Sequence, residues 1–379
     1  MVLDLSQLNT PKDKKKVVKT KSLTTFKQKL EMISSISAKD KIFFVQNLQV
    51  MIKSGLALDR SLNTLASQTK NKRFKAIISD MAESTEKGIS FAESLRKHEK
   101  VFGQLFVNMV KAGEVSGRLE EVLKQIYVQI KKVHELKSKI ISAMTYPVIV
   151  IIAMVGIGIG MMIFVVPKMT SIFNDMDAEL PFLTRFLINF SNFLVGHIVI
   201  STILLILIIL FFVITIKYEK TKYYFHVLFL KLPIVGSIVQ KINMAKFCRT
   251  LSSLIKTDIP IIKSFEITSQ ILGNRLYRKS LLNSIDALKS GETLTEVLNR
   301  YPKLFPPVII QMTAAGEETG TVDEVLGELA SFYEDDIDQI MKTLPSIIEP
   351  ILILVLGSAV GVMAVAIILP MQSITQHIN

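Results

Sequence analysis

Two short segments hold the most regular grouping of polar and glycine residues in this chain. AGEVSG in the first half and AGEETG in the second share a pattern whose matched positions are Gly113, Glu114, Gly117, Gly316, Glu317 and Gly320. A phosphate-binding loop would end in Gly-Lys-Ser or Gly-Lys-Thr, and neither segment does. Each segment precedes an amphipathic helical pattern, so the spacing predicts a tight turn between helices. Docking of a partner on the two glutamates is the second interpretation.

Other groupings that could do chemistry are missing from the sequence. The five histidines have no metal-ligand spacing and lie at His98, His134, His197, His226 and His377. With the single cysteine Cys248, neither a zinc cluster nor an internal disulfide can form. No serine motif of the nucleophile-elbow type occurs. We therefore expect no catalytic residue, no metal, no cofactor and no enzymatic activity.

Charge reverses between matched positions that follow the two turns. The candidate interaction residues are Lys131 and Lys132 in the first half, and Glu334, Asp335, Asp336 and Asp338 in the second. Opposite charges at matched positions would attract if two lobes or two protomers packed about a pseudo-two-fold axis, and each exposed pair would add only about 0–1 kcal/mol. A solvated acidic face and a divalent cation at Glu334–Asp338 are the alternatives.

The matched segments belong to a repeat with a constant offset of 203 residues. Phe44, Phe102 and Pro147, for example, recur as Phe247, Phe305 and Pro350. The copies span roughly 44–167 and 247–370, and both end in an uncharged apolar run. Each copy is therefore predicted to be a polar helical bundle fused to a membrane helix.

Three windows without Asp, Glu, Lys or Arg are long enough to cross a bilayer, since about 30 Å of hydrocarbon requires roughly 20 apolar residues. The predicted transmembrane helices are 147–167, 194–216 and 350–370. Small residues four positions apart in two of them allow close helix packing, although glycine is also common in membrane helices without that role. These are Gly156 with Gly160, and Gly357 with Gly361.

Lysines next to the spans predict the orientation, because Lys and Arg near membrane helices favour the cytoplasmic side. They cluster at 131–139 and after the second span, whereas the connector 168–193 holds more acidic than basic residues. The connector and the tail 371–379 are thus predicted to be external, in the periplasm. The N-terminus, a first bundle over 38–146 and the segment 217–349 with the second bundle are predicted to be cytoplasmic.

The net charge of +12 suggests an anionic partner. Residues 1–37 form a predicted flexible basic arm, which is either a solvated tail or a contact for lipid or a partner protein. Anionic lipid head groups fit this charge. Nucleic acid does not, because the basic residues are spread over helices without a set of stacking aromatic residues. Residues 1–43 lack the sustained apolar core of a cleavable signal peptide.

The apolar residues follow a helical period, and no alternation is long enough for a strand. Breaks at Gly55, Asn71, Gly88, Gly103 and the 113–117 turn predict five or six short helices before the first span. The predicted fold class is thus an all-α membrane protein with two repeated cytoplasmic antiparallel helical bundles and three transmembrane helices.

Several segments are similar to the GspF/PilC family, the inner-membrane platform proteins of type II secretion systems and type IV pili. They are QNLQVMIKSGLALDRSL at 46–62, the two AGE turns, the run YPVIVIIAMVGIGIGMMIFVVPKMTSIFNDMDAELPFLTRFL at 146–187, LPIVGSIVQK at 232–241 and EPILILVLGSAVGVMAVAIILP at 349–370. The resemblance covers about 40–375. Many relatives begin with a glycine-rich segment containing Tyr and Trp, whereas this chain begins with the lysine-rich arm.

The resemblance implies a non-enzymatic, homo-oligomeric platform in the bacterial inner membrane. Its expected partners are a cytoplasmic hexameric assembly ATPase, pilin or pseudopilin subunits that it helps to extract from the membrane, and other inner-membrane assembly proteins. The alternatives are a small-molecule transporter built from repeats, which would need a polar pocket at mid-bilayer, and a membrane-bound enzyme. Uncharged spans disfavour the transporter, because ion and proton pathways usually need charged groups.

Overall fold

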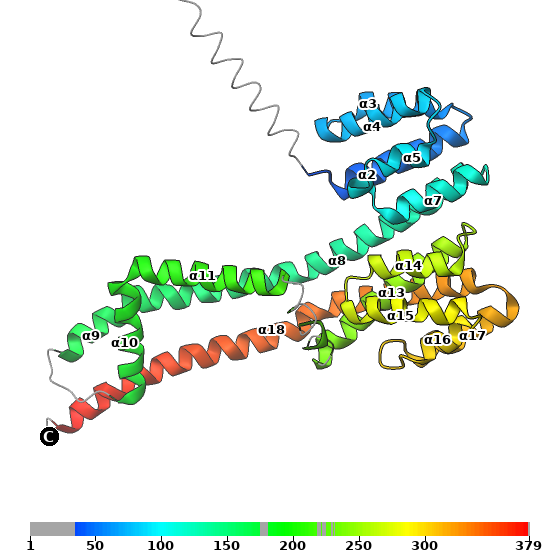
Figure 1. The fold of residues 1–379 in the computed structure, drawn as a ribbon. Helices are drawn as coiled ribbons and strands as arrows, with labels where there is room; N and C mark the ends of the chain where they lie inside the picture. The colour runs from blue at the N-terminus through cyan, green and yellow to red at the C-terminus, as the bar shows by residue number, and fades with distance from the viewer. Residues whose placement is uncertain are drawn as a thin grey trace, which may run out of the picture. The chain divides into compact units, whose positions relative to one another are not determined.

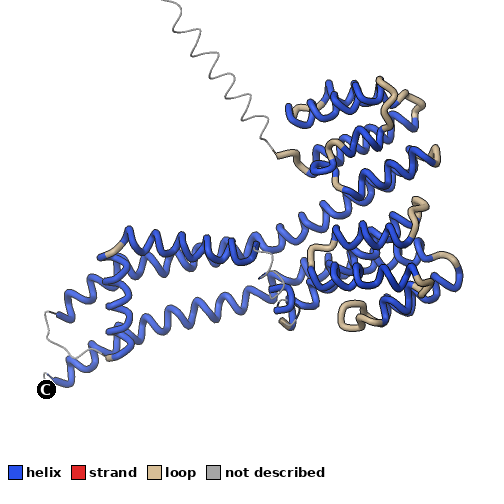
Figure 2. Tube along the Cα trace, viewed as in Figure 1, coloured by secondary structure: helices blue, strands red, loops and turns tan. Residues whose placement is uncertain are grey.

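Helices are the regular secondary structure of the described residues (Figure 2), which include no strand. The computed structural model describes residues 35–174, 181–217, 221, 225–228, 230 and 232–377. Most of the predicted basic arm, 1–34, lies outside them. The chain divides into two compact units, which are Met1–His134 with Ser253–Ile267, and Glu135–Ser252 with Thr268–Asn379. The predicted all-helical character is confirmed for the described part of the chain.

Short helices of the first copy lead into one long helix (Figure 1). They are α2 (Ala38–Lys53), α3 (Leu58–Gln68), α4 (Lys72–Glu86), α5 (Phe91–Arg96), α6 (Glu99–Phe102) and α7 (Gln104–Val115), followed by α8 (Leu119–Gly160). Ser37 and Asp40 form a capping box at the start of α2, which satisfies free backbone N–H groups there. The breaks follow the sequence prediction, except that Gly113 lies inside α7 and the chain turns after it.

The second copy repeats this order of elements, except that its described residues include no helix equivalent to α6. It comprises α13 (Pro233–Ile255), α14 (Ile261–Ile271), α15 (Arg275–Lys289), α16 (Leu294–Asn299), α17 (Pro307–Thr319) and the long α18 (Val322–His377). Thr293 and Glu296 form a capping box before α16, and hydrogen bonds from the backbone N–H and the side chain of Thr293 hold the pKa of Glu296 below its ordinary value. Helix starts in both copies are therefore encoded locally.

The same aromatic cluster forms the core of each copy. In the first unit the ring of Phe44 lies 5.6 Å from that of Phe74 and 5.8 Å from that of Phe102. In the second unit the rings of Phe247 and Tyr277 lie 5.2 and 5.8 Å from that of Phe305. Each of the six rings is buried, and each such aromatic pair adds about 0.5–1.5 kcal/mol beyond its apolar burial. The repeat therefore preserves a three-ring core at matched positions.

The long helices are not interrupted where the sequence analysis separated the bundles from the spans. Helix α8 continues through Pro147 and then through a π-helical turn, Met161–Val165, into α9 (Val166–Asn174). Helix α18 runs without a break from its bundle to His377, so residues 371–377 of the predicted tail are helical. A proline removes one backbone hydrogen bond but does not by itself end a membrane helix, because neighbouring groups satisfy the freed carbonyl.

Two helical stretches, Leu119–Ser171 and Val322–Ala366, are long and apolar enough to span a membrane. A third candidate pairs Thr184–Gly196 with Ile200–Ile208, which meet at an angle of 97°. Apolar side chains along these helices are exposed in the isolated chain, among them Ile152, Phe211 and Leu354. Such large exposed apolar surfaces need lipid or protein around them. Three separate spans remain a prediction.

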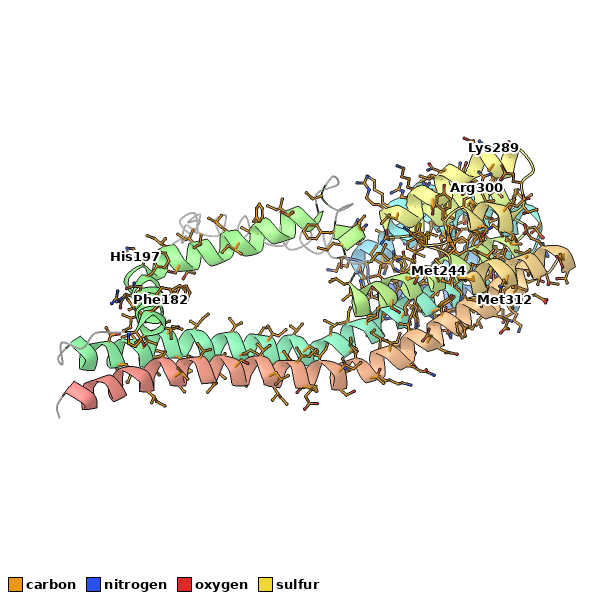
Figure 3. All side chains as sticks on the ribbon, turned by 90° about the horizontal axis from the view of Figure 1, so that it is seen from below. Phe182, His197, Met244, Lys289, Arg300 and Met312 are labelled. Carbon is orange, nitrogen blue, oxygen red and sulfur yellow. The ribbon has the colours of Figure 1, made fainter. Side chains whose placement is uncertain are left out.

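Helix α10 (Phe182–Gly196) links the apolar helices within the second unit, and Figure 3 labels Phe182 and His197 at its two ends. The Ser191 hydroxyl donates to the Met162 carbonyl in the π-helical turn, at 2.5 Å. The Thr184 hydroxyl donates to the Ala366 carbonyl of α18, at 2.7 Å. At His197 the chain bends into α11 (Ile198–Lys217). The predicted connector 168–193 is thus largely helical where the structure describes it.

Candidate interaction sites

In the first copy, each of the three turn residues has a different structural role. Gly113 lies so close to α8 that a Cβ added there would be 2.7 Å from Val122 Cγ2. The Glu114 carboxylate accepts hydrogen bonds from the backbone N–H groups of Phe91, at 2.7 Å, and Ala92, at 2.9 Å. Gly117 has a φ of +70°, which favours glycine. The carboxylate therefore caps the start of α5 from 22 or more residues further along the chain.

In the second copy, the three matched residues have the same structural roles. A Cβ on Gly316 would lie 3.1 Å from Val322 Cα, and Gly320 ends α17 in the left-handed conformation. The Glu317 carboxylate accepts from the backbone N–H groups of Leu294, at 2.5 Å, and Thr295, at 2.9 Å, and also from the Thr295 hydroxyl. Both glutamates thus satisfy helix N–H groups, where a negative charge also complements the helix dipole.

Gly113→Ala should destabilise the protein by about 1–3 kcal/mol, because the new methyl group overlaps the Val122 side chain. Adding Val122→Ala should recover part of this loss, so the two changes should be non-additive. Thermal unfolding of the purified full-length chain measures the coupling. Gly316→Ala with Val325→Ala is the comparison pair, and there we expect less recovery because the nearest atom is backbone Cα.

Glu317→Ala should lower stability by about 1.5–3 kcal/mol, since it leaves the N–H groups at the start of α16 without their charged acceptor. The expected fall in apparent melting midpoint is about 5 °C or more. Glu318→Ala is the matched control, because this neighbouring carboxylate is exposed. Equal melting midpoints for the two variants would show that the cap contributes nothing measurable.

Three of the four candidate acidic residues form ion pairs inside the second unit. Glu334 binds Arg249 through two hydrogen bonds of 2.8 and 2.9 Å, and the exposed fractions of the two side chains are only 13% and 14%. Asp336 lies 2.7 Å from Lys241. Glu334 is therefore mostly covered by a partner from its own copy. A run of charges along the sequence does not indicate this partner.

Asp338 and Asp335 differ in what they contact. Lys139 and Lys342 lie 2.8 and 3.0 Å from Asp338, and their hydrogen bonds keep the pKa of its carboxyl below the ordinary value. Asp335 is exposed. Among the four predicted acidic residues, Asp335 is the one whose exposed position suits an external partner, and the interaction role of the set stays a prediction.

Lys131 and Lys132 lie on the exposed side of α8. The Lys131 ammonium group is 5.7 Å from the centre of the Tyr127 ring, within the range of a cation–π contact. Matched positions in the two copies thus have different surroundings: Glu334 is covered, whereas Lys131 is exposed.

The glycine pairs of the apolar helices make no close helix contact within the described chain. A Cβ added to Gly156, Gly160, Gly357 or Gly361 would meet nothing within 4 Å. Their predicted packing role therefore has no support from contacts within one chain.

A cavity of about 920 Å³ lies among the apolar helices of the second unit. Its lining is mostly aliphatic and aromatic, with hydroxyl groups from Ser201, Thr202 and Ser358. None of the described lining residues is charged. A transporter would need a polar pocket at mid-bilayer, and the apolar lining of this cavity does not supply one, which disfavours that alternative. In the described residues, no group of three or more His, Cys, Asp or Glu could hold a metal ion.

The profile of the family described as type II secretion system (T2SS), protein F, matches residues 44–167 and 247–370. The chain belongs to this family. The two matches coincide with the two repeat copies that the offset of 203 residues indicated, so each copy is one protein F family domain.

Individual relatives cover most of this protein F family member. It is 36% identical to the type IV pilus assembly protein PilC of Thermus thermophilus, over 89% of this chain and 82% of the relative. It is 32% identical to PilC of Myxococcus xanthus, over 91% and 82%. A type II secretion system protein F from Aeromonas hydrophila is 29% identical over 90% and 88%. The resemblance to GspF and PilC is confirmed, and the family with its apolar helices identifies an inner-membrane protein.

Proposed function

We propose that this protein is the inner-membrane platform of a type IV pilus machine. It would couple a cytoplasmic assembly ATPase to the extraction of pilin from the membrane and to fibre assembly. Pilus assembly proteins among the relatives share 36% and 32% identity with this chain, against 29% for the secretion protein F of Aeromonas hydrophila. A type II secretion machine with pseudopilin subunits is the alternative within the same family.

The continuous helices α8 and α18 support this proposal. In each, the last helix of a polar bundle is also an apolar helix long enough for a membrane. A displacement of the bundle is thus carried to the membrane part without passing through a flexible loop. The proposed activity needs no reaction at the protein itself, because the ATPase supplies the free energy.

The proposed partners follow from the same role. A hexameric ATPase would contact the cytoplasmic bundles, pilin would contact the apolar helices, and further inner-membrane assembly proteins and other copies of the platform would complete the machine. Binding of the purified full-length protein to the ATPase of its own gene cluster tests the first contact. No binding under conditions that preserve the pilus machine would remove the main support for coupling.

Deleting the gene and scoring surface pili and secreted proteins separates the two machines. We expect loss of pili with normal secretion, restored by the wild-type gene. Loss of secretion with normal pili would instead place the protein in a type II system.

We expect reporter fusions after residues 140, 180, 280 and 379 to read inside, outside, inside and outside. This order follows from the lysines that flank the apolar helices. Dual alkaline phosphatase and fluorescent-protein reporters measure both sides independently. An inside reading at 180 would mean that the first apolar helix does not cross the membrane. An outside reading at both 180 and 280 would mean that α10 and α11 do not complete a span, and it would reverse the proposed orientation of the C-terminus.

A further inference from the structure

Helices α8 and α13, which belong to different repeat copies, cover each other along matching stripes. In the first unit the Ser253 hydroxyl donates to the Gln129 amide oxygen over 3.4 Å, and the two residues are only 6% and 2% exposed. In the second unit Lys246 is partly buried close to Lys137, and burial together with this charge lowers its pKa. Residue numbers rise along α8 as they fall along α13, so the two stripes run antiparallel.

The stripe on α13 continues through Thr250, which is also buried, and the buried Thr257 follows in the turn after the helix. On α8 it continues to Leu136, again buried. Residues three or four positions apart share one face of a helix, so each set forms a single face. One copy therefore uses its last helix, and the other copy its first helix, to make this contact.

On the other two helices, the equivalent stripes include exposed apolar side chains beside the polar residues Asn47 and Gln339. On α2, the residues equivalent to Lys246 and Ser253 are Phe43 and Val50, whose side chains are 49% and 53% exposed. On α18, the residue equivalent to Gln129 is Phe332. Its side chain is 57% exposed, and the exposed Glu328 and Asp335 flank it. Surfaces that are covered in one copy are thus free in the other.

We infer that the α18 stripe of one molecule binds the α2 stripe of a second molecule, repeating between chains the antiparallel contact that α8 and α13 make within one chain. The repeat relation identifies a second copy of this chain as the occupant. In such a contact Phe332 replaces Gln129, and Val50 of the neighbouring molecule replaces Ser253.

At both contact points, the two residues that meet within the chain and the two equivalent residues of the proposed contact differ in the same way. Where the chain pairs Gln129 with Ser253, two polar groups, the equivalent pair is Phe332 with Val50, two apolar groups. Where the chain places Lys137 near Lys246, the equivalent pair is Ile340 with Phe43. Both members of each pair change together from polar to apolar. This explains why large apolar side chains are exposed on α2 and on the bundle part of α18, where association would remove them from water.

Charge also matches across the proposed contact. The α18 stripe lies among exposed carboxylates, Glu324, Glu328 and Asp335. Helix α2 has an exposed lysine near its end, Lys53, which the antiparallel register places close to Glu328. Such a pair favours one orientation and one partner more than it adds affinity. It would support an antiparallel register around the central pair of Phe332 and Val50.

This contact is heterologous, since two different surfaces meet. A heterologous contact leaves one free stripe at each end, so further copies add and form a closed ring if the rotation between neighbours closes, or an open filament if it does not. The pseudo-two-fold arrangement considered for the charge reversal is a different geometry, in which like surfaces meet. The inference goes beyond the proposed function, because it depends on the repeat and on burial and not on which fibre the machine assembles.

Cysteine cross-linking in membranes tests it with the full-length protein. Val50→Cys and Phe332→Cys are made in separate chains with different tags and co-expressed, and an oxidant is then added. Cβ atoms must come within about 3.5–4.5 Å for a disulfide. We expect a disulfide between the two tagged chains, loss of that species with reductant, and no disulfide for either variant expressed alone. A single chain carrying both cysteines should give a ladder of dimers, trimers and larger species.

Leu282→Cys on α15, another exposed apolar position, replaces Phe332→Cys as the matched control and should give no cross-link with Val50→Cys. The native Cys248 is buried and is present in every variant. Disulfides between two copies of the same variant would indicate a two-fold contact and overturn the inference. Absence of the mixed disulfide in membranes that contain both chains at wild-type levels would overturn it as well.

Discussion

Glu334→Ala should be among the most destabilising single substitutions in the second bundle, at about 3–5 kcal/mol. The Arg249 guanidinium is mostly buried and binds both oxygens of this carboxylate, so removing Glu334 leaves a buried cation without its counter-charge. The Ser331 hydroxyl, 3.0 Å from Arg249, remains as an acceptor but carries no charge. The apparent melting midpoint of the purified full-length protein measures the loss.

Asp286→Ala is the control, because the Lys289–Asp286 pair also joins a cation to a carboxylate but has both side chains exposed. Figure 3 labels Lys289 on α15. Loss of that pair should cost only about 0–1 kcal/mol. The double variant Arg249→Met with Glu334→Leu should recover most of the stability, because an apolar pair of similar volume avoids the buried charge. Equal effects of Glu334→Ala and Asp286→Ala would mean that water screens the Arg249 pair.

A flexible insertion in α18 should abolish fibre assembly while leaving the protein in the membrane. Four residues, Gly-Ser-Gly-Ser, placed between Thr343 and Leu344 interrupt the helix between its bundle and its apolar part. If the continuous helix transmits displacement, a flexible joint removes the transmission, and we expect loss of surface pili. Immunoblotting of membrane fractions and counting of pili measure the two properties separately.

The same four residues inserted after Lys70 are the control, since this loop between α3 and α4 is outside the long helices. We expect normal insertion and pilus numbers close to wild type for that variant. Normal piliation with the α18 insertion would show that coupling does not need a continuous helix, and the proposed mechanism would then have to be abandoned.

Helix boundaries were largely predictable because they depend on local residues. Glycines and asparagines at the breaks, and the Ser37 and Thr293 capping boxes, act within a few positions of themselves. The AGE turn was recognised as a turn for the same reason. The target of its glutamate was not predictable, because Glu114 caps a helix that starts 23 residues earlier, and no periodic pattern encodes this pairing.

The acidic run shows the same limit more clearly. The sequence predicted a single acidic face that contains Glu334, Asp335, Asp336 and Asp338, because these residues lie close together along the chain. Packing separates them, because Arg249 and Lys241 on α13 reach Glu334 and Asp336 and leave Asp335 exposed. The partners lie 85 and 95 positions away in sequence, beyond any local signal.

By itself, the sequence determined the duplication, the helical class, the apolar helices and the family, because each is encoded in composition, period or identity along the chain. Only the tertiary structure decided which carboxylates are paired, which glycines approach a neighbouring helix and which stripes remain uncovered. Those properties depend on contacts between helices far apart in the sequence. Gln129 and Phe332 occupy equivalent repeat positions, yet one is buried and the other exposed, because a helix of the other copy covers one of them within the chain.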